Sequence, residues 1–366
     1  MDAPIRIGLI GLGRAGMHGH LPELAARPDQ FVVTAGYDPI PERRAELRQR
    51  TGAEPRESEQ EVINDPGVDL VDVANRSVDH HATARSALEA GKYVLVEKPL
   101  CVTYEEAREL VELDAKLGGG RLFVRHNRRF DPDFVHFKEI IASGILGTVF
   151  EIKLRRHKFD RRNDWQTVRA YGGGQLLNWG AHVVDHGLQL LGGPLASVWS
   201  DVKRVAAAGD AEDHVRIMLR SEPISGPGAA SGDESEGTAE KTGPLGGRVV
   251  DIEISGGVAI AEPVYTAYGT RGTLVGSTTE FELRYLDPAV RLPRRDVDLA
   301  PPVGYDSDER LSWEHETRAV APVDTQTMWD GLYAAIRTGG TYPVTLEQAL
   351  EVMRVVSEAR RGTLTT

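Results

Sequence analysis

Near its start the chain reads Ile5-Arg6-Ile7-Gly8-Leu9-Ile10-Gly11-Leu12-Gly13-Arg14-Ala15-Gly16, an apolar run that leads straight into a G-x-G-x-x-G turn. Each glycine of this turn has a separate task in holding a dinucleotide. Gly11 makes the tight turn, Gly13 lets the backbone approach the pyrophosphate, and Gly16 lets the following helix pack closely on the strand. The pyrophosphate would lie at the positive N-terminus of a helix that begins near Arg14. The residues expected to contact the cofactor here are Gly11, Leu12, Gly13, Arg14, Ala15 and Gly16.

An acid follows at the end of the next apolar run, Phe31–Tyr37, where Asp38 closes the pattern. A carboxylate at this point can accept hydrogen bonds from both ribose hydroxyls and repels a 2′-phosphate, which favours NAD over NADP. Arg43 and Arg44 come soon after and could weaken that repulsion, although exposed charges on the helix opened by Pro41 are their commoner role. The sequence therefore predicts NAD as the cofactor and leaves NADP open.

Composition limits the classes of protein to which the chain can belong. Its 366 residues are enough for two ordinary domains, and 40% hydrophobic with 27% charged residues is typical of a soluble globular protein. A formal net charge of −12 argues against a nucleic-acid partner, because phosphate binding needs a basic face. No apolar run is long enough to cross a membrane, and a first strand at Ile5 leaves no room for a signal peptide. The single cysteine, Cys101, excludes an internal disulfide and suits a reducing cytoplasm, where we expect the protein.

Up to about residue 125, short apolar runs alternate with helical segments. Local signals support this pattern, with Pro41 at a helix start, Gly52 and Gly91 after helix ends, and Thr103-x-x-Glu106 as a capping box. Alternating strands and helices predict an α/β fold with a doubly wound parallel sheet, and we expect residues 1–125 to form the cofactor domain. The predicted strands lie at 5–10, 31–37, 69–74, 93–97 and 121–125, and the predicted helices at 14–27, 41–51, 58–64, 79–90 and 103–117.

Residues 126–366 follow a different pattern and are expected to form a second α/β domain that binds the substrate. A helix near 131–142 precedes a long strand at 148–158, and another helix follows the glycines at 172–174. Several β-rich runs then succeed one another without helices, which predicts an open, mostly antiparallel sheet. Helices near 324–338 and 345–360 could pack on either domain. The β-rich runs lie at 195–205, 213–220, 248–255, 258–268 and 272–286.

One segment, 221–247, is rich in Gly, Ser and Pro and has no aromatic residue. It cannot bury enough apolar surface to offset the entropy lost on ordering it. We therefore expect a flexible insertion between two strands rather than a functional lid.

A charged pair closes the run Tyr93-Val94-Leu95-Val96-Glu97-Lys98-Pro99. In an open parallel sheet the carboxyl ends of the strands face the ligand crevice. Glu97 and Lys98 would therefore lie near the nicotinamide end of the cofactor. The alternative is a surface salt bridge at a strand end, which is the commoner role for such a pair taken alone.

The helix expected after the glycines at 172–174 carries its polar side chains on one stripe. Asn178, His182, Asp185 and Gln189 recur at helical spacing, and the consecutive glycines let another body approach the start of the helix. The alternative is an amphipathic helix that shows its polar face to water. His182 and Asp185 have no cluster of Cys or Glu beside them, so we expect no metal site.

Six motifs follow one another along the chain: Gly11–Gly16, His80, Ala90–Pro99, Arg128–Pro132, Gly172–Asp185 and Tyr268–Gly272. In order and spacing they resemble those of the Gfo/Idh/MocA oxidoreductase family, over nearly the whole chain apart from the insertion. The resemblance implies an N-terminal Rossmann domain joined to an α/β domain with an open, mostly antiparallel sheet, which commonly serves as an oligomer interface. We therefore expect a homo-oligomer, a dimer or a tetramer, that associates through the C-terminal sheet.

By this resemblance Lys98 is the lysine of an E-K-P motif and His182 is the catalytic histidine. Lys98 would donate a hydrogen bond to the reacting hydroxyl and stabilise negative charge on its oxygen, and His182 would take or return the hydroxyl proton. The Lys98–Pro99 bond is expected to be cis. The other implied contacts are those of Asn75, Glu97, Asn127 and Arg128 or Arg129 with the cofactor, and those of Arg156, Lys158 and Asp185 with the substrate.

Asn178 departs from the family pattern, in which Asp usually stands at this position. An amide can hold His182 by a hydrogen bond, but it does not stabilise the imidazolium as a carboxylate does. We therefore expect a less basic His182 and a pH optimum displaced downward from that of Asp-bearing relatives.

The resemblance implies an NAD(P)-dependent oxidoreductase that transfers hydride between nicotinamide and a secondary hydroxyl of a sugar, sugar derivative or cyclitol. One alternative is an NAD-dependent glycosidase that oxidises its sugar transiently. Another is a catalytically silent regulator that binds a sugar or nucleotide, with Asn178 as the residue that motivates it. Turnover distinguishes the three hypotheses. An oxidoreductase forms NADH, a glycosidase cleaves a bond without net NADH, and a regulator binds its ligand without turnover.

Overall fold

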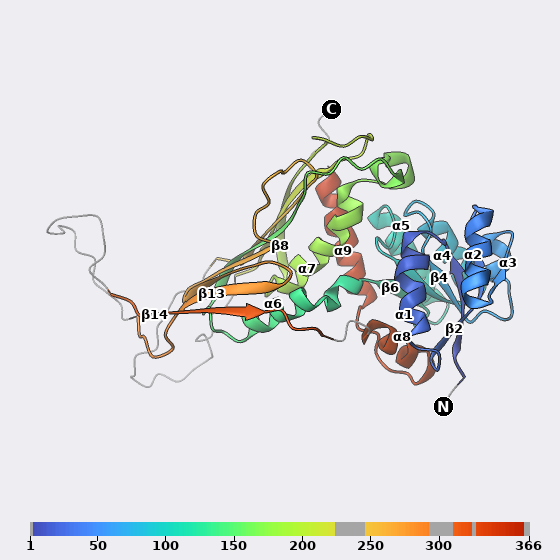
Figure 1. Ribbon diagram of the computed structural model, residues 1–366, viewed down its shortest axis with the longest axis horizontal. Helices are drawn as coiled ribbons and strands as arrows, with labels where there is room; N and C mark the ends of the chain where they lie inside the picture. The colour runs from blue at the N-terminus through green and yellow to red at the C-terminus, as the bar shows by residue number, and fades with distance from the viewer. Residues whose placement is uncertain (1–2, 224–245, 293–309, 324–326, 362–366) are drawn as a thin grey trace.

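The computed structural model describes residues 3–223, 246–292, 310–323 and 327–361, with two sheets at opposite ends of an elongated molecule (Figure 1). The first sheet has the order β3-β2-β1-β4-β5-β6, and all of its strand pairs are parallel. This confirms the doubly wound α/β fold predicted for the first part of the chain. Its strands are β1 (Ile5–Ile10), β2 (Phe31–Tyr37), β3 (Glu54–Pro55), β4 (Leu70–Val73), β5 (Tyr93–Glu97) and β6 (Leu122–Arg125).

Helices cover both faces of this sheet because its strands are apolar on both sides. Ile7 and Leu9 of β1 pack with helices on one face, whereas Val71 and Val94 pack with helices on the other. The predicted capping box is present, since Thr103 caps the last of these helices. The helical segments are η1 (Arg14–His20), α1 (Leu21–Ala25), α2 (Pro41–Thr51), α3 (Glu59–Ile63), α4 (His80–Glu89) and α5 (Tyr104–Lys116).

The second sheet has eight strands in the order β14-β13-β12-β11-β7-β10-β9-β8. All of its pairs are antiparallel except β10 with β7, so the prediction of a mostly antiparallel sheet is confirmed. Its strands are β7 (Val149–His157), β8 (Leu195–Lys203), β9 (His214–Ser221), β10 (Val249–Ser255), β11 (Tyr265–Gly269), β12 (Gly272–Gly276), β13 (Glu280–Leu286) and β14 (Trp313–Ala319).

Some strand predictions for this sheet were wrong. The run predicted at 258–268 becomes a strand only at Tyr265, after Pro263, which has no N–H to donate to a ladder. The run predicted at 272–286 divides into β12 and β13, because Ser277 Oγ accepts hydrogen bonds from backbone N–H groups of the turn between them. Strands β3 and β14 were not predicted at all. The insertion expected at 221–247 falls mostly on residues 224–245, which lie outside the described residues.

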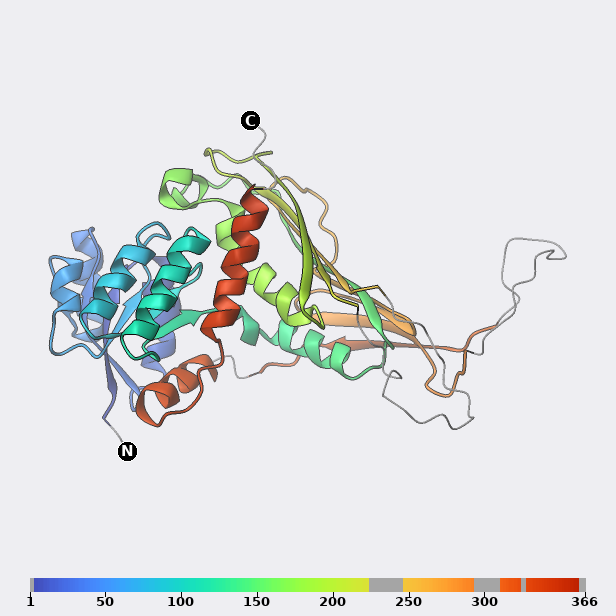
Figure 2. The ribbon, with the colours of Figure 1, turned by 180° about the vertical axis from the view of Figure 1, so that it is seen from behind.

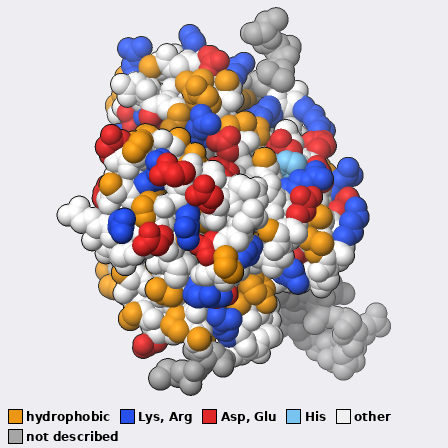
Figure 3. Space-filling view, turned by 90° about the vertical axis from the view of Figure 1, so that its right-hand side faces the viewer, with side chains coloured by type: hydrophobic (Ala, Val, Ile, Leu, Met, Phe, Trp, Pro, Cys, Tyr) orange, Lys and Arg blue, Asp and Glu red, His pale blue; other side chains and the backbone are white. Residues whose placement is uncertain are grey.

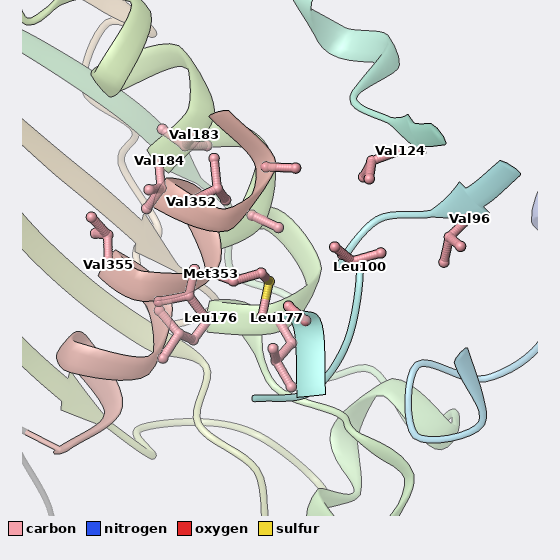
Figure 4. Packing of buried hydrophobic residues seen from close by; sticks show 14 of the residues in the cluster. Val96, Leu100, Val124, Leu176, Leu177, Val183, Val184, Val352, Met353 and Val355 are labelled. Carbon is pink, nitrogen blue, oxygen red and sulfur yellow. The ribbon is translucent and has the colours of Figure 1, made fainter. Parts of the chain in front are cut away.

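Helices α6 (Pro132–Ala142) and α7 (Ala181–Leu190) pack on the inner face of the large sheet, and α9 runs between the two lobes (Figure 2). Leu176 and Leu177 pack in one apolar cluster with Met353 of α9 and with Leu100, which follows β5 in the other lobe (Figure 4). The core of one lobe therefore continues into the core of the other. These helical segments are η2 (Asn127–Phe130), α6 (Pro132–Ala142), η3 (Trp165–Thr167), η4 (Arg169–Tyr171), η5 (Leu176–Gly180), α7 (Ala181–Leu190), α8 (Thr327–Arg337) and α9 (Leu346–Arg361).

The sequence left open on which domain the C-terminal helices pack, and α8 packs on the first. Its side chains Met328, Trp329 and Leu332 are buried with apolar residues of β1 and β2, so α8 covers the first sheet. Arg27 pairs with Asp330 and holds the helix there. Helix α9 instead contacts both lobes, through α5 on one side and through α7 and β8 on the other.

Two surface properties bear on possible partners. Within the part of the chain that is described, every helix is too short or too polar to span a membrane. The face of the first lobe that points away from the second sheet carries acidic and basic side chains interspersed (Figure 3). No single-sign patch covers that view of the molecule.

Candidate active site

The glycine turn after β1 has the shape that a pyrophosphate requires. Gly11 has a φ of +97°, and a Cβ on it would lie 2.3 Å from the backbone nitrogen of Asn75. A Cβ on Gly16 would lie 2.3 Å from the carbonyl oxygen of Gly11, so this residue allows the helix to pack on the turn. At Gly13, by contrast, the nearest atom would be an Arg43 nitrogen at 3.8 Å, which leaves the backbone open to a ligand. The side-chain oxygen of Asn75 is buried, and no described residue donates a hydrogen bond to it. These residues therefore fit a bound dinucleotide.

Asp38 lies at the end of β2, as predicted, but its carboxylate already has local partners. One oxygen accepts from the backbone N–H of Leu12 at 2.9 Å and the other from that of Ile40 at 3.0 Å. Arg43 approaches the same carboxylate to 3.3 Å. A carboxylate has about four acceptor sites, so ribose hydroxyls can still be accepted. Leu12 is buried and Ala15 half-buried behind the turn.

Lys98 follows β5 and reaches across to the second lobe. The Lys98–Pro99 bond is cis, as predicted. The ammonium donates to the backbone carbonyl of Asn178 at 3.1 Å and approaches its side-chain oxygen at 3.4 Å. Burial, with help from Arg128 and Arg14 and against the pull of Glu97, lowers the pKa of Lys98 to about 8. The cation is thus desolvated, and it remains mostly protonated at neutral pH.

His182 lies one helical turn beyond Asn178, at the start of α7, and is buried. Burial, and after it the charges of Lys98 and Arg128, keep the pKa of His182 well below its ordinary value. Its Nδ1 has no hydrogen-bond partner among the described residues. A neutral imidazole with a free nitrogen can accept a proton, and the ammonium of Lys98 is close enough to act on its charge.

The structure corrects the expected role of Asn178. Its side chain contacts Lys98, and no hydrogen bond joins it to His182 within the described residues. An amide at this position therefore affects the lysine first and the histidine only through it.

Asp185 is a second correction among the residues assigned to the substrate. Its carboxylate is buried and forms a two-pronged ion pair with Arg129, at 2.5 and 2.7 Å. Arg129 therefore serves to hold α7, and the pairing commits the charge of Asp185 to this arginine rather than to a substrate. Lys158, just past β7, has a side chain that is 76% exposed and pairs with Asp160. Asn127 begins η2 and is half-buried.

Arg128 and Arg156 meet at one aromatic ring beside the histidine. Their guanidinium carbons lie 4.4 and 5.4 Å from the ring centre of Trp179, the residue after Asn178. The Trp179 and His182 rings are 5.9 Å apart. The resemblance implies a cofactor contact for Arg128 or Arg129 and a substrate contact for Arg156, and the structure places Arg128 and Arg156 within reach of the same ring. Trp179 was not singled out in the sequence, where it reads as a core aromatic.

Glu97 turns away from the ammonium of Lys98 into a buried network behind it. One carboxylate oxygen accepts from His20 and from Arg125, each at 2.8 Å, and the other accepts from the backbone N–H of Lys98 at 3.0 Å. His20 also bonds Asp72 at 2.7 Å. The surface salt bridge considered as an alternative is therefore wrong. Glu97 and Arg125 end adjacent strands and Asp72 is the residue before the end of the strand beside them, and these positions could have revealed the network.

A small polar hollow with about 20 Å³ of space for water lies beside Asn178. Gln166 on its wall accepts a hydrogen bond from Arg14 of the glycine turn at 2.9 Å, so the hollow borders the cofactor crevice. Gln175 contributes a buried side-chain oxygen that has no hydrogen-bond partner among the described residues. The other lining residues are Asp160, Arg162, Thr167, Ala207, Ala211, Glu212 and Asp213.

Two family models match the chain. "Oxidoreductase family, NAD-binding Rossmann fold" matches residues 5–126, and "GFO/IDH/MocA C-terminal domain" matches residues 134–275. The chain is 30% identical over 364 residues to the uncharacterized oxidoreductase YdgJ of Escherichia coli, covering 97% of this chain and 95% of that one. It is 26% identical to the scyllo-inositol 2-dehydrogenase (NADP(+)) IolW of Bacillus subtilis, covering 97% and 92%. The solved WlbA dehydrogenase of Bordetella pertussis, in complex with NADH and UDP-GlcNAcA, superposes with a TM-score of 0.73 at 19% identity, covering 99% and 96%.

Proposed function

Because the chain belongs to the Gfo/Idh/MocA oxidoreductase family, we propose that it oxidises a secondary hydroxyl of a sugar, sugar derivative or cyclitol with NAD. The observation that carries the proposal is the meeting of Lys98 and His182. They come from different lobes, and the lysine donates to the backbone of Asn178, one helical turn before the histidine. The charge of Arg14 in the glycine turn also acts on Lys98. The relative IolW, named as an inositol dehydrogenase, supports this class of substrate.

In the proposed reaction Lys98 and His182 have separate roles. The bound cofactor supplies the acceptor for the hydride that leaves the carbinol carbon. Lys98 donates a hydrogen bond to the hydroxyl oxygen and stabilises its developing negative charge. His182, held neutral by burial, takes the hydroxyl proton at a ring nitrogen, and the carbinol becomes a carbonyl. The residues that would hold the cofactor are Gly11, Leu12, Gly13, Arg14, Ala15, Gly16, Asp38, Asn75 and Asn127.

A panel of sugars, inositols and glycosides tests the proposal, with NAD and NADP in parallel and the absorbance of reduced nicotinamide as the signal. We expect net NADH formation with at least one polyol. Lys98→Ala and His182→Ala should each lower kcat by about a hundredfold or more, while cofactor binding, followed by fluorescence, is retained. Bond cleavage without net NADH would identify a glycosidase instead, and tight binding without turnover a silent regulator.

The outer face of the second sheet supports the proposal of a homo-oligomer. Trp199 of β8 and Met218 of β9 are a cross-strand pair, and their side chains are 53% and 37% exposed. Ser200, the next residue along β8, bonds α9 on the inner face, so Trp199 points outward. Light scattering should give the mass of a dimer or a tetramer, and Trp199→Glu should lower it.

A further inference from the structure

We infer that the substrate carries an anionic oxygen group and that the guanidinium groups of Arg156 and Arg128, which meet at Trp179, bind it. The inference rests on the proposed function and names the class of substrate for that site. The first observation is that Arg156 is partly buried and that, within the described residues, most of its N–H donors lack a good hydrogen-bond partner.

Arg156 stands near the end of β7, on the face of the sheet that the helices cover. Its neighbours on that face, Ile152 and Leu154, are core residues. Its two hydrogen bonds are long, at 3.4 Å to the carbonyl of Arg155 and 3.3 Å to the hydroxyl of Tyr265. Its Nε is buried with no partner, and within the described residues it forms no ion pair. A guanidinium carries five N–H donors, and at this one most are left for a ligand.

The positions of both guanidinium groups tie them to the reaction centre. Each contacts the Trp179 ring, and that ring contacts the His182 ring edge-on. The charge of Arg128 also acts on Lys98. A ligand whose hydroxyl lies between Lys98 and His182 therefore has a second end close to the arginines. Arginine binds carboxylate and phosphate oxygens in pairs, which neutral hydroxyls cannot reproduce.

The charges around the site also favour an anionic ligand. Although the whole chain has a net charge of −12, the charged groups with the largest effect on His182 are the cations Lys98 and Arg128. Asp131 pairs with Arg128 and compensates that charge, whereas Asp133 accepts from the Tyr265 hydroxyl and Asp185 pairs with Arg129. Within the described residues these carboxylates leave Arg156 without an ion pair. An anion beside Arg156 offsets its positive charge.

The small hollow beside Asn178 adjoins the arginines, because its chain neighbour Trp179 contacts them. Its walls carry carboxylates, amides and a hydroxyl, and within the described residues a buried oxygen of Gln175 lacks a donor that one ligand hydroxyl would supply. A hydroxylated acid, such as a uronic or aldonic acid, offers a hydroxyl to this hollow and a carboxylate to the arginines.

Matched substrates test the inference: D-glucuronate against D-glucose, D-galacturonate against D-galactose, and D-glucose 6-phosphate as the phosphate arm. In the wild-type protein with saturating NAD, we expect kcat/KM for an anionic sugar to exceed that of its neutral partner by about tenfold or more. Arg156→Gln should remove this preference by raising KM for the acid, and Arg156→Lys should restore part of it. A higher kcat/KM for D-glucose 6-phosphate than for the uronic acids would still show that the site binds an anionic group, and would identify that group as a phosphate.

Arg284→Gln is the matched control, because Arg284 also stacks on a tryptophan, Trp313, at 5.1 Å but lies on β13 away from the site. It should leave both substrates unaffected. Equal or faster oxidation of the neutral sugars, with no effect of Arg156→Gln on any of them, would overturn the inference and leave the proposed function standing. If no sugar is oxidised, the proposed function fails, and calorimetric titration with D-glucuronate and D-glucose still decides whether the acid binds through Arg156.

Discussion

Asn178 touches the lysine of the site, and this contact changes what its replacement should do. Its side-chain oxygen lies 3.4 Å from the ammonium of Lys98, whose pKa is about 8. The proposed reaction requires Lys98 protonated and His182 neutral. The rate should therefore fall above about pH 8, as the ammonium is lost, and on the acidic side only below the lowered pKa of His182.

Asn178→Asp should move the alkaline limb of the pH profile upward by about one unit or more, because a carboxylate beside the ammonium favours its protonated form. The acidic limb, set by His182, should move less. The measurement is kcat/KM across pH for the wild type and the variant. Asn64→Asp, which adds the same charge on α3's exposed end, is the control and should leave both limbs in place. A shift of the acidic limb alone would show that residue 178 acts on His182 directly.

At the scale of elements, the ends of three adjacent strands share one buried charge network. Asp72 of β4, Glu97 of β5 and Arg125 of β6 surround His20 from η1. Burial by itself would lower the pKa of His20, but the charge of Asp72 and hydrogen bonds to Asp72 and Glu97 raise it to about 9. The network fixes the strand end from which Lys98 extends.

This network makes stability depend on pH in the alkaline range. The folded-state pKa of His20 is raised above its ordinary value of 6.5, so the stabilisation is complete below about pH 6.5 and is lost as pH rises through about 9. The loss should be on the order of 3 kcal/mol. His20→Gln should flatten this dependence in urea unfolding at pH 6 and at pH 10. His18→Gln, which changes an exposed residue of the same segment, should retain it.

Sequence patterns predicted the elements of the first sheet well and those of the second less well. Strand β5 was predicted with its observed bounds, because buried parallel strands are apolar throughout. Strand β14, Trp-Glu-His-Glu-Thr-Arg-Ala, lies at a sheet edge and is mostly polar, so no apolar pattern marks it. Lys98 and His182 were predicted from motifs. The strand ends could have indicated the partners of His20, but the pairing of Asp185 with Arg129 could not be predicted, since the two residues are distant in the chain and their contact depends on how the elements pack.

At the scale of the whole molecule, one apolar cluster joins the two lobes. Met353 of α9 is buried in it together with Leu100 from one lobe and Leu177 from the other (Figure 4). Since packing is shared in this way, the lobes should unfold together rather than one after the other.

Met353→Ala should destabilise the protein by about 2–5 kcal/mol, because it leaves a cavity in this shared core. Unfolding in urea, followed by far-UV circular dichroism and by tryptophan fluorescence, should show one transition whose midpoint falls equally in both signals. Leu117→Ala, at an exposed position after α5, should have little effect. Two separated transitions would mean that the lobes are independent.

Helix α8 has a consequence for the way the chain is made. It completes the core around β1 and β2 with Met328, Trp329 and Leu332, yet it is synthesised after the whole second sheet. A nascent chain on the ribosome therefore exposes an unfinished apolar face of its earliest strands throughout most of translation. Chaperones that bind such faces should meet this protein early and release it only once the last helices have emerged.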